Sequence, residues 1–365
     1  MELPRWLVPP KSRFQKARWV RLSVSVGCSV AALFFIRALM NNDTLMLPSV
    51  SYRRPPIPNI VHYTMMMRDE LSEFDINFVS FLSVYSALRM LKAPRIYIHT
   101  DFNETMIRQA REEGSKWTRK LLNDFPEINM NHVPVITHAN GKEITAVEHR
   151  SDMVRFNQIY DKGGLYLDFD VYALRDARVL REAGFNNVVG RQADGGLNNG
   201  CFMSRPKSAL AYIMKRDQWT TFDGGWLTHS VVLLTQISER LVKSPGEVLI
   251  LDQLAMAPWG WGDEDHKRMY LPHKDTVPQF PQVNDPTEDP MARWQDRVRG
   301  NDWELDFSST YFLHAFRPHG GSLPGFDGVS VKYILERNSN FALATWHIVQ
   351  IGLKEGVFVE DDNEI

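Results

Sequence analysis

From residue 57 onward, short apolar runs alternate with longer segments whose apolar residues recur every three or four positions. Ile60–Tyr63, Arg95–His99 and Val133–Ile136 are predicted as strands, and Phe74–Leu91 and Glu104–Leu122 as helices. Because strands and helices alternate, we expect an α/β domain with a mainly parallel, mixed sheet flanked by helices on both faces. Ligands of such sheets bind beyond the carboxyl ends of the strands.

The stretch Gly163–Tyr172 alternates apolar and polar residues, which predicts one continuous strand. Its apolar face would carry Leu165, Leu167, Phe169 and Val171, and its polar face Tyr166, Asp168, Asp170 and Tyr172. The two carboxylates would then point the same way, with Cα atoms about 6.6 Å apart, twice the rise of a strand residue. Two hard oxygen donors at this spacing can hold one divalent cation and the phosphates bound to it. The alternative is a pair of surface aspartates on an edge strand.

A helix is predicted just before this strand. Thr145 and Glu148 have capping-box spacing, so the helix should run from about residue 146 to 160 and stop near Gly163. Asp152 and Arg155, three residues apart, share one of its faces. As a surface ion pair, they would contribute under about 1 kcal/mol.

Several positions between residues 151 and 170 resemble the signature of D-X-D sugar-binding glycosyltransferases. They are Ser151-Asp152-x-x-Arg155, Tyr160, Gly163-Gly164, Tyr166 and Asp168-x-Asp170. That family, glycosyltransferase family 32, includes fungal initiating α-1,6-mannosyltransferases, inositol-phosphorylceramide mannosyltransferases and animal α-1,4-galactosyltransferases. A lone D-x-D pair is a weak signal, whereas these positions in a helix, turn and strand context are specific. The resemblance implies the nucleotide-diphospho-sugar transferase (GT-A type) fold and a hexosyltransferase.

The resemblance also implies a role for each of these residues. Asp170 would be a direct metal ligand, and Asp168 would face the ribose, the sugar and the metal. Asp152 and Arg155 would bind donor-sugar hydroxyls, and Tyr166 would lie along the nucleotide. A bound Mn²⁺ or Mg²⁺ would neutralise the leaving diphosphate, so no protein acid is required. Because the family retains the anomeric configuration, we assign no general base.

Two flanking segments extend the resemblance. Ile57–Thr64 resembles the family's opening strand, which borders the nucleotide base. His62 would form a hydrogen bond to the nucleotide there, and a histidine with a purely structural role is an equal alternative. Leu197–Pro206 resembles an asparagine-rich turn before a strand, where the amides of Asn198 and Asn199 would bind sugar hydroxyls. The alternative for this second segment is a plain turn.

A late segment, Thr310–Phe316, resembles the strand that returns a histidine to the metal. His314 would be the third protein ligand, with His319 as the alternative. Thr228–Thr235 matches a family region only loosely, and we assign it no role.

The N-terminal region has the pattern of a membrane anchor. Six basic residues against one acidic residue occupy positions 1–21, and an uncharged run follows. We expect a cytosolic tail at 1–18, a transmembrane signal-anchor at 19–40, about 33 Å long as a helix, a stem at 41–56 and a lumenal domain at 57–365. This is a single-pass type II topology of the Golgi or another secretory compartment. A cleaved signal peptide is the alternative.

Composition narrows the function classes. The chain has 365 residues, of which 44% are hydrophobic and 24% charged, as in a globular protein. Without residues 1–50, 35 basic residues face 42 acidic ones, so nucleic-acid binding is not expected. Asn103 lies in a glycosylation sequon.

Two other function classes remain open. One is a haloacid-dehalogenase-like phosphohydrolase with Asp168 as nucleophile, which Tyr172 disfavours because that motif has Thr or Val there. The other is a catalytically dead, membrane-tethered binding protein. The donor, UDP-hexose or GDP-mannose, and the acceptor, a glycan, a sphingolipid or a small metabolite, also stay open.

Overall fold

The computed structural model describes residues 54–274, 301–316, 323–324 and 326–365, which belong to one compact unit beginning at Arg54. The predicted tail and membrane span, and nearly all of the predicted stem, lie outside the described residues. Among the described helices, none combines the length and apolar character that a membrane span requires.

In the described part of the chain, seven strands form the central sheet in the order β10-β8-β9-β6-β1-β2-β3. Their bounds are β1 Ile60–Met65, β2 Arg95–Thr100, β3 Ile128–His132, β6 Gly164–Leu167, β8 Asn187–Arg191, β9 Leu197–Ser204 and β10 Val248–Leu251. Strand β1 is parallel to β2 and β6, β2 to β3, and β8 to β10, whereas β9 is antiparallel to both neighbours. The predicted mixed, mainly parallel sheet is confirmed.

Two small antiparallel pairs accompany this sheet. Strand β7, Val171–Ala173, pairs with β11, Phe312–His314, and β4, His138–Ala139, pairs with β5, Lys142–Glu143. The first pair matters for function, because it joins the end of the acidic motif to a segment 140 residues later in the chain.

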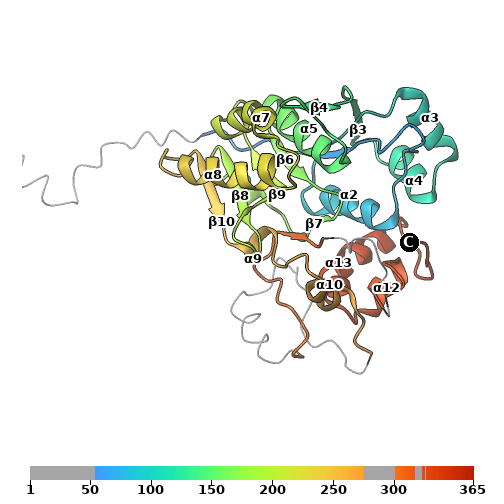
Figure 1. Cartoon of the computed structure of the whole chain (residues 1–365). Coiled ribbons are helices and arrows are strands. Elements are labelled where there is room, and N and C mark those ends of the chain that lie inside the picture. Colours follow the sequence, from blue (N-terminus) through green and yellow to red (C-terminus); the bar gives the residue numbers. More distant parts are fainter. Residues whose placement is uncertain (1–53, 275–300, 317–322, 325) are drawn as a thin grey trace, which may run out of the picture. The chain divides into compact units, whose positions relative to one another are not determined.

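Helices cover both faces of the sheet (Figure 1). The helices are α2 Phe78–Met90, α3 Glu104–Glu113, α4 Lys116–Asp124, α5 Val147–Lys162, α6 Arg178–Arg181, α7 Ala209–Thr221, the π-helical turn η1 Thr228–Val232, α8 Leu233–Leu241, α9 Gln253–Met256, α10 Asp263–Tyr270, α12 Val331–Glu336 and α13 Asn340–Lys354. Leu165 and Leu167 of β6 belong to the core shared with α2, α4 and α13, whereas Tyr166 between them belongs to the core of α5, α7 and α8. Each fully buried leucine of this kind contributes about 1.5–3 kcal/mol.

The single helix predicted over Glu104–Leu122 is wrong, because the chain forms two helices there. Gly114 ends α3, and the Ser115 hydroxyl caps α4 by accepting from the backbone N–H of Thr118. A Cβ at position 114 would lie 2.4 Å from the carbonyl oxygen of Ala110, so the close approach requires glycine.

The strand predicted at Val133–Ile136 is also wrong, since the strand here is β3. Strand β3 is the sheet's edge and pairs with β2 alone. Its two apolar residues, Ile128 and Met130, alternate with polar ones and are only partly buried against the core, so the strand lacks a continuous apolar run. Val133 lies after the strand, and its apolar side chain packs with Met66 and Val154 in a small buried cluster.

Helix α5 lies where the sequence predicted it, with a different start. Its N-cap is Ala146, and no side chain caps it, so the capping box of Thr145 and Glu148 is wrong. Its end is confirmed at Gly163, which has φ +65° and donates its N–H to Ile159 at 2.9 Å. A left-handed φ at this position favours glycine and turns the chain directly into β6.

A row of neutral side chains crosses the sheet beside this turn. His62 Nε2 lies 2.8 Å from the carbonyl oxygen of Gly163, His62 Nδ1 lies 2.9 Å from His99 Nε2, and His99 Nδ1 lies 2.9 Å from the Asn131 amide nitrogen. Because a carbonyl only accepts, His62 Nε2 and His99 Nε2 must each donate, and each Nδ1 must accept. Burial lowers the pKa of His62 to about 4 and the pKa of His99 to about 2. With both ring nitrogens bonded inside the protein, His62 fits the structural alternative and offers no atom to a nucleotide.

We predict that the free energy of unfolding falls as the pH drops from 7.5 to 5. Histidines of the unfolded chain take up protons near pH 6.5, whereas His62 and His99 stay neutral in the folded chain down to about pH 4, so stability is present above pH 6.5 and lost below it. The loss by pH 5 is on the order of 2 kcal/mol for each histidine. Urea unfolding across this pH range measures it.

The control is His62→Gln. It should be less stable at pH 7.5 and should show a flatter pH dependence, although not a flat one, because burial also lowers the pKa of His149 and His347. A pH slope as steep as that of the wild type would refute the assignment.

Candidate active site

The acidic motif forms a turn, so the prediction of one continuous strand is wrong. Strand β6 ends at Leu167, and β7 begins at Val171. Between them the backbone N–H of Val171 donates to the Asp168 carbonyl at 3.0 Å, and this turn interrupts the alternation. Tyr172 therefore packs in the other core, 5.0 Å from the ring of Phe341, and does not share a face with Tyr166.

The turn brings both carboxylates to a histidine of β11. Ligand atoms of Asp168, Asp170 and His314 all lie within 4.8 Å of one another. The Asn198 side-chain oxygen lies 3.1 Å from His314 Nδ1, and this contact leaves His314 Nε2 facing Asp170 Oδ1 at 3.4 Å. Two carboxylates and an imidazole are suitable ligands for Mn²⁺, so the three predicted metal ligands are placed together in a set that fits the metal. The alternative ligand His319 lies outside the described residues.

Gly200 of β9 makes room for this group. Its backbone carbonyl accepts from the Asp168 N–H at 2.8 Å. A Cβ at this position would lie 2.5 Å from Asp168 Oδ2 and 2.7 Å from His314 Cε1. Any side chain here would displace two of the three ligands.

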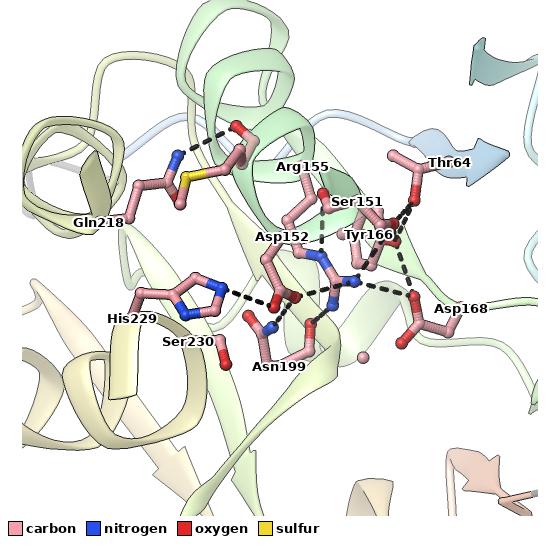
Figure 2. Close-up of polar contacts among 12 residues, drawn as sticks. Thr64, Ser151, Asp152, Arg155, Tyr166, Asp168, Asn199, Gln218, His229 and Ser230 are labelled. Carbon is pink, nitrogen blue, oxygen red and sulfur yellow. Dashed lines mark hydrogen bonds and ion pairs between the residues drawn. The ribbon is translucent and has the colours of Figure 1, made fainter. Parts of the chain in front are cut away.

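Arg155 connects the acidic turn to the helix before it (Figure 2). Its Nη1 donates to the Asn199 carbonyl at 2.7 Å, and its Nη2 lies 3.1 Å from Asp152 Oδ1 and 3.4 Å from Asp168 Oδ1. The guanidinium also lies 4.4 Å from the Tyr166 ring centre. Burial lowers the pKa of Arg155, but the surrounding carboxylates and tyrosine outweigh it and raise the pKa above its ordinary value. The cation therefore stays charged inside the protein.

Tyr166 lies beneath the site. It is fully buried, donates its hydroxyl to Asp168 Oδ1 at 2.7 Å and lies 2.6 Å from the Thr64 hydroxyl. Burial raises the pKa of Asp168, and the like charge of Asp170 adds to it, against the opposing effect of Arg155. The Asp168 side chain nevertheless keeps 30% of its surface exposed, enough to reach a ligand. Tyr166 thus orients the Asp168 carboxylate through a hydrogen bond from the buried side of the site.

Asn198 and Asn199 lie inside strand β9, so the predicted turn is wrong at this point. Asn199 donates its amide to Asp152 Oδ1 at 2.6 Å, and the Asn198 side-chain oxygen accepts from the Gly200 N–H at 2.8 Å. The remaining amide atoms, Asn198 Nδ2 and Asn199 Oδ1, are buried and have no hydrogen-bond partner within the described residues. A buried polar atom without a partner costs about 1–3 kcal/mol, so this donor and acceptor are suited to a polar ligand.

His229 is the residue that the sequence analysis missed. It is fully buried on the π-helical turn η1, and its Nε2 lies 3.1 Å from Asp152 Oδ2 (Figure 2). Arg155 and Asn199 thus bind one oxygen of Asp152, and His229 lies close to the other. The available signal was a lone histidine entering an apolar helix, in a segment assigned no role. Single-turn π-helices occur often at functional sites.

Residues 84–192 match the family model described as "Glycosyltransferase sugar-binding region containing DXD motif". The chain carries a DXD glycosyltransferase region. This region contains α5 and the acidic turn, and it confirms the predicted resemblance to DXD glycosyltransferases at the level of a glycosyltransferase.

The chain is also similar to a curated protein and to solved structures. The chain is 27% identical over 238 residues to "Glucan organizing enzyme 1" of Cryptococcus neoformans, covering 60% of this chain and 59% of that protein, so it spans about three fifths of the relative's length. Among solved structures, PaToxG glycosyltransferase has 14% identity and a TM-score of 0.36, covering 52% of this chain and 70% of its own. Glycosyltransferase GlyE of Streptococcus pneumoniae has 11% identity and a TM-score of 0.37, covering 84% and 66%.

We predict that Gly200→Ala lowers Mn²⁺ affinity at least tenfold, because the added Cβ overlaps two ligand side chains. Titration with Mn²⁺, followed by electron paramagnetic resonance of the free ion, measures it. Gly190→Ala in the neighbouring strand β8 is the control, since its Cβ would meet Met256 instead and should lower stability alone. Unchanged Mn²⁺ affinity in folded Gly200→Ala would remove the metal assignment.

Proposed function

We propose that this protein is a metal-dependent hexosyltransferase that transfers a hexose from a nucleotide diphosphate sugar to an acceptor hydroxyl. The observation that carries the proposal is the joining of two groups by Arg155: the set Asp168, Asp170 and His314, and the buried polar cluster around Asp152. The matched DXD region, residues 84–192, includes the three aspartates of these two groups and the arginine that joins them. We also propose a GT-A type fold, which the mixed sheet with its acidic turn after β6 supports.

The donor would bind across both groups. Asp168, Asp170 and His314 would hold Mn²⁺ or Mg²⁺, which supplies positive charge to the departing diphosphate. Asn198 Nδ2 and Asn199 Oδ1 would meet sugar hydroxyls with one donor and one acceptor, beside the guanidinium of Arg155. Asp152 would keep Arg155 and Asn199 in position, since each of its oxygens already contacts protein groups.

The reaction would retain the anomeric configuration. A leaving-group oxygen of the diphosphate would take the proton of the acceptor hydroxyl on the face from which it departs, so we assign no protein base. UDP-hexose and GDP-mannose are the donor candidates, and a glycan, a sphingolipid or a small metabolite is the acceptor class. The printed name of the fungal relative favours a glycan.

We predict that Asp170→Asn abolishes metal-dependent donor hydrolysis while the melting temperature of the metal-free protein stays unchanged or rises. Asp170 and Asp168 repel each other without a cation, so neutralising one relieves the repulsion and removes charge that would hold the metal. Release of UDP or GDP from UDP-hexoses and GDP-mannose, with Mn²⁺ or with chelator, measures the activity beside apo melting.

Three outcomes would count against the proposed function. Asp170→Asn turning over at the wild-type rate would exclude the metal role. Wild-type protein without Mn²⁺-dependent nucleotide binding would favour the catalytically dead alternative, and release of phosphate from a phosphoester would favour the phosphohydrolase.

We further propose a Golgi-type, single-pass type II protein with the span at 19–40 and the described unit in the lumen. The support is the basic excess before the apolar run and a sequon after it. Asn103 is exposed at the start of α3, where its side-chain oxygen accepts from the Met106 N–H at 3.0 Å.

This topology predicts that Asn103 carries a glycan sensitive to endoglycosidase while a tag at residue 1 is digested by protease in intact microsomes. Asn103→Gln should remove the shift in gel mobility. A protein whose Asn103 is unglycosylated in cells and whose described unit is digested without detergent would contradict it.

A further inference from the structure

The loop between α7 and η1 carries Trp226, whose ring contacts His149 of helix α5. Resting on the proposed function, we propose that Trp226 is an acceptor subsite on which a sugar ring of a glycan stacks. The acceptor would then be a carbohydrate, bound near the residues proposed to bind the donor sugar.

Helix α5 sets the position of this loop relative to the site. The Ser151 hydroxyl contacts the Thr64 hydroxyl near the carboxyl end of β1, whereas Gly163 at the other end of α5 contacts His62 within β1. The helix therefore runs opposite to β1, and its first turn extends past the strand ends, on the side where ligands of such sheets bind. His149 lies three residues before Asp152 and therefore farther in that direction, by about 4.5 Å along the helix axis.

Trp226 lies over this first turn. Its ring is 5.1 Å from the ring of His149, and the ring of His149 is 4.8 Å from that of His229. His229 in turn contacts Asp152. A continuous set of ring contacts thus connects Trp226 to the residues proposed to position the donor sugar.

Trp226 is exposed although its surroundings are fixed. It keeps 56% of its surface exposed, and Leu227 beside it 36%. Asp223 accepts from the Gly225 N–H at 2.8 Å and from the Thr228 hydroxyl at 3.1 Å, and its carbonyl accepts from Lys142 at 2.7 Å. A large apolar ring held toward solvent by a bonded loop is arranged in advance for a ligand.

The chemistry around Trp226 suits a sugar. An indole face is apolar and electron-rich, which matches the C–H face of a pyranose. Polar groups lie in the same loop, where the Lys142 ammonium donates to the Asp223 carbonyl. Beneath the indole, His149 Nε2 is buried and has no hydrogen-bond partner among the described residues. Mixed apolar and polar groups of this kind favour a carbohydrate over a lipid surface, which requires a broad apolar face.

The test uses the full chain and separates transfer from donor hydrolysis. Maltose, cellobiose, laminaribiose, lactose and α-1,6-mannobiose serve as acceptor probes, with the nucleotide sugar that the wild type hydrolyses. We expect at least one disaccharide to stimulate nucleotide release, and Trp226→Ala to raise its KM about tenfold while hydrolysis without acceptor stays within twofold. Trp226→Tyr should restore most of the affinity. Tyr212→Ala is the matched control, since Tyr212 is also an exposed aromatic residue, 48% exposed on α7 against Tyr160.

Each other outcome overturns the subsite. Trp226→Ala with the wild-type KM, an equal loss in Tyr212→Ala, or no stimulation by any disaccharide would each exclude a stacked sugar at Trp226. Stimulation by ceramide-containing vesicles alone would assign the loop to a lipid. If the wild type hydrolyses no nucleotide sugar, the proposed function itself fails, so the two failures are distinguishable.

Discussion

The buried guanidinium of Arg155 is the interaction on which the rest of the site depends. Removing a cation from water costs several kcal/mol, and it is stable here only because carboxylates, a carbonyl and an aromatic face surround it. Those partners come from α5, β6, the acidic turn and β9, so one cation holds four segments at fixed separations. The same charge lies between the residues proposed to meet the sugar and those proposed to meet the metal.

The contacts of His62 with His99 and Gly163 help to position helix α5, which carries Arg155. His62 bonds the carbonyl of Gly163, which ends α5 and starts β6 with a left-handed φ. The length of α5 between Gly163 and Ser151 then sets Asp152 and Arg155 level with the strand ends. The contact between His62 and this part of the chain is thus with the backbone carbonyl that ends α5.

The third candidate metal ligand, His314, joins the two aspartates through a contact that is remote in sequence. Pairing of β11 with β7 brings His314 opposite Val171, and the Ala315 N–H donates to the Asp170 carbonyl at 3.0 Å. Asn198 then orients the imidazole. The acidic turn is thus bonded on one side to β9 through Gly200 and on the other to β11, so backbone hydrogen bonds hold the three candidate ligands near one another.

Local sequence determined the elements whose signals repeat over a few residues. These were β1, β2, α2 and the body and end of α5, together with the placement of Asp152 and Arg155 on one face, because side-chain period and glycine conformation act within a turn or two. The packing of segments far apart in the chain decided what local pattern could not. It folded the predicted strand into a turn at Asp168, set the asparagines inside β9, and brought His229 to Asp152 and His314 to Asp170. Such contacts depend on which strands pair and which helices cover them, and the residues that make them carry no periodic signal of their own.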